Sequence, residues 1–123
     1  MSVSINPMNP RVLFVVTSDP RRSGRPAEAV RIAAGVGVWQ KVEIAIYLRD
    51  EAVRALGESS ERLIDEDYYT RYWPVLAAAS QPVYVQQNAP ALRDLGPALL
   101  PFAEISDAQL AELAARQDYV LRF

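Results

Sequence analysis

Short apolar stretches alternate with helical patterns along the whole of this 123-residue chain. Residues 11–17, RVLFVVT, form a continuous apolar run rich in β-branched side chains, which is typical of a strand buried on both faces of a parallel sheet. Five such stretches separated by helices predict one domain over 1–123, a three-layer α/β/α sandwich with an open, mainly parallel five-stranded sheet. The predicted strands are 11–17, 41–48, 82–86, 100–105 and 118–123, and the predicted helices are 26–40, 50–56, 65–80, 89–96 and 108–117.

Several of these elements carry a more specific expectation. The alternation in KVEIAIYL (41–48) predicts a strand with one less buried face. Pro74 should kink or divide its helix, because proline lacks the N–H that a helix interior needs. Ser106 or Asp107 can cap the last helix. Gly35 and Gly37 lie inside the first helix, where close packing on the sheet or on another subunit would account for them.

The chain contains no cysteine and no histidine. It therefore has no disulfide, thiolate nucleophile, persulfide carrier or imidazole base, and neither thiolate nor histidine metal sites are possible. A net charge of −2 argues against nucleic acid as a partner. No apolar run is long enough to span a membrane, and the N-terminal residues do not resemble a secretory signal, so we expect a cytoplasmic protein.

The loop SDPRRSGR follows the first strand and precedes the first helix. Ligands of open parallel sheets bind beyond the carboxyl ends of the strands, and a helix N-terminus favours anions. A phosphate, carboxylate or sulfur oxyanion is a reasonable ligand for this loop. The alternative is that these arginines are simply solvated, as arginines on surface loops commonly are. The candidate ligand-binding residues are Thr17, Ser18, Arg21, Arg22, Ser23 and Arg25.

Two groups of carboxylates have simpler explanations than acid–base catalysis or metal binding. Asp19 and Asp50 follow neighbouring predicted strands and could do acid–base work, but Asp19 can equally form the turn of its loop. The run 65–67, Asp-Glu-Asp, lies at a helix start, where acidic side chains complement the dipole and do not converge on one ion. We expect no catalytic residue, no metal site and no cofactor.

Four aromatic residues follow at helical spacing. Tyr68 and Tyr72 are one turn apart, as are Tyr69 and Trp73, so the rings spread around the helix. Some of them should therefore reach a partner, since tyrosine and tryptophan favour interfaces. Half-buried packing over the sheet is the alternative.

The order of these segments resembles the DsrE/DsrF-like family, which includes TusB, TusC and TusD of sulfur relay. The similarity is carried by FVVTSDP with its following polar loop and small-residue helix, by YLRDEAVRAL, and by the ending LAARQDYVLRF. The resemblance implies a compact α/β/α domain that assembles into dimers, trimers or hexamers. It also implies a sulfur-carrying cysteine after a central strand, where this chain has VYVQQNAPALRDLG and Tyr84.

A phenol cannot hold a persulfide, so the resemblance implies a cysteine-free member of that family. The leading hypothesis is a non-catalytic, oligomer-forming domain, either a homo-oligomer or a structural subunit that partners cysteine-bearing sulfur-transfer proteins. The alternative is a binding module for a small anionic ligand or nucleotide at the arginine-rich loop. An enzyme that uses tyrosine or carboxylate chemistry is a third possibility.

Overall fold

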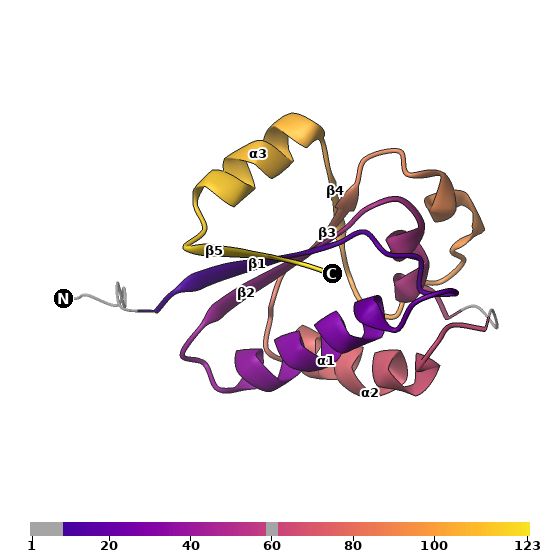
Figure 1. Cartoon of the computed structure of the whole chain (residues 1–123), viewed down its shortest axis with the longest axis horizontal. Coiled ribbons are helices and arrows are strands. Elements are labelled where there is room, and N and C mark those ends of the chain that lie inside the picture. Colours follow the sequence, from indigo (N-terminus) through magenta and orange to yellow (C-terminus); the bar gives the residue numbers. More distant parts are fainter. Residues whose placement is uncertain (1–8, 59–61) are drawn as a thin grey trace.

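One five-stranded sheet lies between two helical layers in the computed structural model, which describes residues 9–58 and 62–123 (Figure 1). The elements in chain order are β1 (Arg11–Val16), α1 (Arg25–Val38), β2 (Glu43–Leu48), the 3-10 helix η1 (Asp50–Leu56), α2 (Glu66–Ala78), β3 (Val83–Gln86), the 3-10 helix η2 (Pro90–Asp94), β4 (Ala103–Ile105), α3 (Asp107–Ala115) and β5 (Tyr119–Arg122). All five predicted strands are present, and each predicted helix overlaps a helix or a 3-10 turn.

The strand order is β4-β3-β2-β1-β5, and every neighbouring pair in this sheet is parallel. The first and last strands therefore lie side by side. At the start of this pair, the backbone N–H of Asp118 donates to the Arg11 carbonyl at 2.8 Å, and the Arg11 N–H donates to the Asp118 carboxylate at 2.7 Å. β5 and β4 form the two edges of the sheet.

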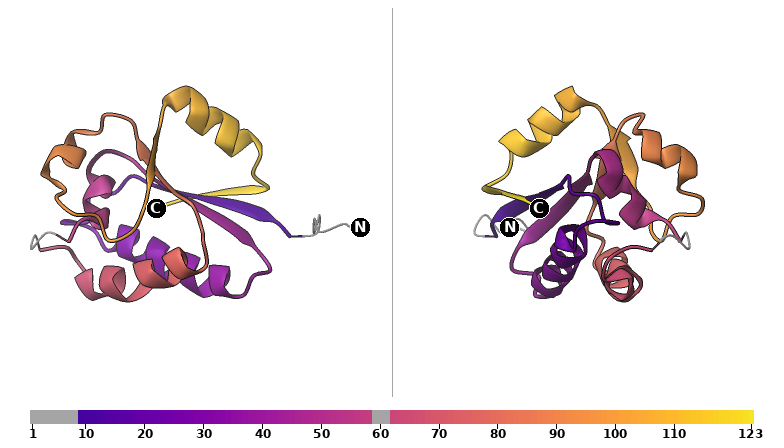
Figure 2. Two further views of the ribbon diagram at one scale, coloured as in Figure 1. Left: turned by 180° about the vertical axis from the view of Figure 1, so that it is seen from behind. Right: turned by 45° about the vertical axis from the view of Figure 1, so that its right-hand side comes forward.

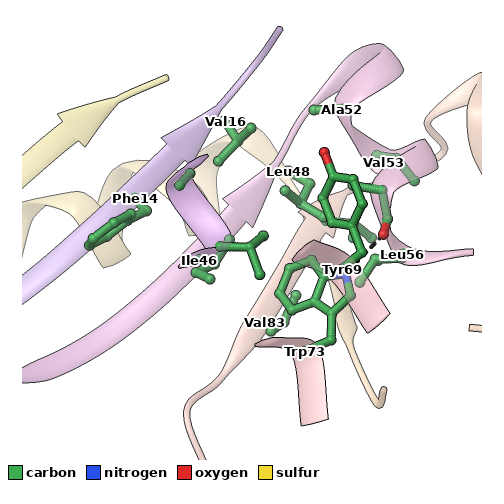
Figure 3. Packing of buried hydrophobic residues seen from close by; sticks show 14 of the residues in the cluster. Phe14, Val16, Ile46, Leu48, Ala52, Val53, Leu56, Tyr69, Trp73 and Val83 are labelled. Carbon is green, nitrogen blue, oxygen red and sulfur yellow. Dashed lines mark hydrogen bonds between the residues drawn. The ribbon is translucent and has the colours of Figure 1, made fainter. Parts of the chain in front are cut away.

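Helices α1 and α2 pack together on one face of the sheet, where the larger part of the core lies (Figures 1 and 2). Figure 3 shows Trp73 and Tyr69 of α2 among Leu48, Leu56 and Val83. The Trp73 indole N–H donates to the carbonyl of Ala55 in η1 at 2.8 Å, so the largest buried side chain also satisfies its polar atom.

The two glycines of α1 have different surroundings. At Gly37 a Cβ would lie 3.5 Å from the Gln81 side chain, which is an ordinary van der Waals contact with the segment before β3. At Gly35 a Cβ would meet nothing within 4 Å, and the residue is exposed. Packing within the described residues therefore requires a glycine at neither position.

Helix α3 covers the opposite face, over Leu13, Tyr47 and Ile105 (Figure 2). Its Leu110 and Leu113 pack on these residues but stay half-buried, and no residue within α3 is fully buried. Ser106 caps this helix in a reciprocal capping box with Gln109, which confirms one of the two predicted caps. The α3 layer therefore contributes fewer buried side chains than the layer of α1 and α2.

One sequence expectation was wrong, and one of the two outcomes expected at Pro74 is excluded. β2 is buried on both faces, because it is the central strand and α3 covers the side that carries Tyr47, whose side chain is fully buried. Of the two outcomes expected at Pro74, a kinked or a divided helix, division does not occur, since α2 runs through Pro74 without interruption. Pro74 and Thr70 are both exposed, so water can bond the Thr70 carbonyl that would otherwise accept from residue 74.

Candidate functional site

The loop between β1 and α1 lies at the carboxyl edge of the sheet, as predicted. Backbone bonds fix it from two sides: the Thr17 N–H donates to the Phe123 carbonyl at 3.0 Å, and the Ile64 N–H donates to the Pro20 carbonyl at 2.9 Å. The loop therefore lies against the C-terminal residue and against the segment that leads into α2.

Asp19 organises this loop. Its carbonyl accepts the N–H groups of Arg22 and Ser23, both at 3.0 Å. Its carboxylate accepts the Arg21 N–H at 2.9 Å and both arms of the Arg21 guanidinium, Nε at 3.1 Å and Nη2 at 2.9 Å. This bidentate hydrogen bonding to Arg21 lowers the pKa of the Asp19 carboxyl below its ordinary value. Asp19 thus forms the turn of its loop, and a carboxyl with a lowered pKa is a poor general acid near neutral pH.

Two of the three arginines of the loop, Arg21 and Arg22, lie beside the Asp19 carboxylate, whereas Arg25 has a separate partner. Arg21 also lies 3.5 Å from the Glu51 carboxylate of η1. The Arg25 guanidinium donates to the Arg122 carbonyl at 3.0 Å and lies 5.8 Å from the centre of the Phe123 ring. Arg22 lies 4.0 Å from the Asp19 carboxylate, with 86% of its own side chain exposed. The loop therefore does not bring its three guanidinium groups to one point.

The hydroxyl groups and the helix start offer little more to an anion. Thr17 is exposed, and Ser18 and Ser23 are half-buried. The Ser23 hydroxyl accepts the Arg25 N–H at 3.1 Å, and Pro26, which has no N–H, follows in the first turn of α1. The Arg25 N–H is thus already bonded and residue 26 has none, so two of the donors that an anion would use at this helix start are lost.

A second polar group at the same edge was missed from the sequence. Arg49, directly after β2, donates through Nη1 to the Tyr47 hydroxyl at 3.0 Å and to the Asp107 carboxylate at 2.9 Å. Burial raises the pKa of Tyr47, and the bond to Asp107 raises the pKa of Arg49, so both side chains keep their protons. The period of two in the strand places Tyr47 and Arg49 on one face, which is the signal that could have paired them.

Asp50 has no direct part in this group. Its backbone is in the left-handed region, with φ of 54°, and its N–H donates to the Gln86 side-chain carbonyl at 2.9 Å. That bond links the end of β2 to β3. Asp50 therefore fixes the turn into η1, and Asp19 and Asp50 have separate partners.

Tyr84, at the position where the resemblance places the sulfur-carrying cysteine, lies within β3 between Tyr47 of β2 and Ala103 of β4. Its half-buried side chain packs with the residues under α3. Tyr84 lines two open hollows of about 370 and 400 Å³. Residues 80–82 also line both of these hollows. The phenol thus stands in an accessible part of the sheet face.

The four aromatic residues of α2 divide into two pairs. Tyr69 and Trp73 belong to the core, with 2% and 0% exposure. Tyr68 and Tyr72 are half-buried and meet edge to face, with ring centres 5.8 Å apart. Of the four predicted interface residues, only this second pair is open to a partner.

A hollow of about 410 Å³ lies beside the start of α2 and is lined by Glu58, Glu66, Asp67 and Tyr69. The buried Tyr69 hydroxyl has no hydrogen-bond partner within residues 9–58 and 62–123, and burial raises the pKa of this phenol. In the same described part of the chain, no three acidic side chains gather as metal ligands. Nor does it contain a helix of the length and apolarity that crossing a bilayer requires.

Comparison with known proteins gives one clear relationship, at the level of structure. No family model matches the chain, and no curated protein matches it. Among solved structures, the crystal structure of the YchN protein from E. coli superposes with a TM-score of 0.76 at 19% sequence identity, covering 93% of this chain and 99% of that chain. The expected fold, an α/β/α sandwich around an open parallel sheet of five strands, is confirmed.

Proposed function

We propose that this chain is a non-catalytic, oligomer-forming DsrE-like domain that acts as a structural subunit beside a cysteine-bearing sulfur-transfer protein. The proposal rests on one combination: the fold is retained over nearly the whole chain, whereas the sequence has no cysteine and has Tyr84 at the expected carrier position. A tyrosine can fill the space of a carrier residue but cannot accept sulfane sulfur, so any transfer chemistry has to reside in another chain.

The alternative, an anionic-ligand module at the arginine-rich loop, has less support. Arg21 is held by Asp19 and Glu51, and Arg25 is held by the C-terminal strand. A ligand would have to displace these contacts before it could use either guanidinium group.

Co-purification from the native cells tests the partnership. The tagged chain is isolated and its partners are identified by mass, and we expect a cysteine-bearing sulfur-transfer protein in stoichiometric amount. Tyr68→Ala combined with Tyr72→Ala should remove this partner, because these two are the aromatic residues of α2 that remain accessible. Trp39→Ala is the matched control, since Trp39 is 66% exposed and belongs to another element. Recovery of the chain without any cysteine-bearing protein would contradict the proposed partnership.

A further inference from the structure

The outer edge of β5 is apolar, and no strand of residues 9–58 and 62–123 covers it. Within these residues β5 pairs with β1 alone, so the backbone groups along its other side have no strand to pair with there. Three successive side chains on it are exposed: Tyr119 at 61%, Val120 at 40% and Leu121 at 41%. Natural edge strands are usually protected by lysine, proline or a bulge, and β5 contains neither lysine nor proline.

The exposed side chains of β5 lie beside apolar residues of both core layers. Val120 is in register with Leu13, which faces α3, whereas Leu121 is in register with Phe14, which faces α1. Side chains in register on neighbouring strands point to the same face of a sheet. A strand added outside β5 would therefore bury apolar surface on both faces at once.

Opposite charges flank the apolar residues. Asp118 precedes β5 and Arg122 ends it, so the segment reads Asp-Tyr-Val-Leu-Arg. An antiparallel copy centred on Val120 would place Asp118 opposite Arg122 of the second copy, and Tyr119 opposite Leu121. A parallel copy in register would instead set like charges beside each other. The Arg122 guanidinium has no ion pair within the described residues, and Asp118 accepts one bond, from the Arg11 N–H at 2.7 Å, so both charges can take part.

We propose that β5 pairs antiparallel with β5 of a second copy of this chain, joining the two sheets into one. This inference rests on the oligomer-forming part of the proposed function and names its surface and partner. The arrangement has twofold symmetry and closes on itself, so it stops at a dimer. A pair of short strands buries less than the roughly 1,600 Å² of a standard interface, so the dimer is weak and depends on concentration.

The test compares the self-association of charge variants by analytical ultracentrifugation, from micromolar to millimolar protein. The wild type should dimerise. Arg122→Glu sets two acidic side chains opposite each other at both ends of the strand pair and should weaken the dimer about ten-fold or more. Asp118→Arg should do the same with two basic side chains. Arg93→Glu, an equal charge change at an exposed position on η2, is the matched control and should associate like the wild type.

An equimolar mixture of Arg122→Glu and Asp118→Arg chains provides the decisive measurement. Each variant repels itself, but the two are complementary in the antiparallel pairing, so native mass spectrometry should show the mixed dimer in excess over either homodimer. Absence of that excess would overturn the proposal.

Two further outcomes separate this inference from the proposed function. If the wild type associates and Arg122→Glu associates equally well, the β5 pairing is wrong while oligomer formation stands on another surface. If the wild type stays monomeric throughout, both the β5 pairing and self-association are wrong. Co-purification of a cysteine-bearing protein remains an independent result in either case.

Discussion

Asp19 holds the loop between β1 and α1 through both its carbonyl and its carboxylate. The two backbone bonds to Arg22 and Ser23 set the turn, and the bidentate pair with Arg21 fixes the guanidinium beside η1. The carboxylate side chain is 19% exposed, so solvent screens this pair only in part. One residue therefore fixes both the backbone turn and the Arg21 side chain of this basic loop.

Replacing Asp19 by asparagine should destabilise the protein by about 1–2 kcal/mol near neutral pH, because the charged hydrogen bonds to Arg21 are lost. The fold lowers the pKa of Asp19, so its contribution is present above the ordinary value of 3.8 and is lost as the pH falls through the lower folded-state pKa. The stability difference between wild type and Asp19→Asn should therefore shrink below about pH 4. Urea unfolding across this pH range measures it.

Glu112→Gln is the control for that series, since it neutralises an exposed carboxylate on α3. It should leave the midpoint of unfolding unchanged near neutral pH. A constant gap between wild type and Asp19→Asn down to strongly acidic pH would show that the Arg21 pairing contributes no pH-dependent stability.

The position of this loop could be predicted from the sequence, but its pairing could not. An apolar strand followed by a proline-flanked turn and a helix places residues 17–25 at the sheet edge by topology alone. The partners of Arg21 and Arg25 come from η1 and from the C-terminal strand, which lie far away in the sequence. The bond from Arg49 to Asp107 escaped prediction for the same reason, whereas the bond to Tyr47, two residues away, could have been inferred from the period of two in the strand.

At the scale of elements, the strands were the most predictable part and the helices the least. Continuous apolar runs identify buried strands well, because both faces of a parallel sheet are covered. Residues 50–56 form a 3-10 helix that packs on η2 and accepts a hydrogen bond from Trp73 of α2, and these contacts with distant segments are not encoded by any local pattern. The uninterrupted course of α2 through Pro74 likewise depends on which side of the helix faces solvent.

Two glycines provide a matched test of element packing. At Gly57, just after η1, a Cβ would lie 2.7 Å from the Leu95 carbonyl oxygen, so Gly57→Ala forces backbone to move and should lower stability by about 1–3 kcal/mol. At Gly35 the space is open, so Gly35→Ala should raise stability by about 1 kcal/mol through helix propensity. Thermal unfolding of the two variants tests both expectations. Equal shifts of the two unfolding midpoints in the same direction would contradict this account.

Across the whole molecule, the two helical layers differ in depth. The α1–α2 layer holds most of the fully buried side chains, whereas α3 contributes none and β5 is exposed along its length. Segments with few buried contacts open at a lower free-energy cost than the rest of a fold. The molecule should therefore open first on the side of α3 and β5.

Amide hydrogen exchange should show this order directly. We expect the slowest exchange in β1 and β2 and markedly faster exchange in α3 and β5 at low protein concentration. Raising the concentration should slow exchange in β5 more than in α3, if β5 pairs with its copy. Equal protection of α1 and α3 would contradict the difference in depth.

The neighbouring positions of β1 and β5 also bear on how the polypeptide is made. The two strands meet through residues 107 positions apart, so one side of β1 stays unpaired in the nascent chain until residues 118–122 have left the ribosome. Contacts between such distant residues are costly to form and slow the search for the native state. We therefore infer that this sheet is completed late, when β5 closes against β1.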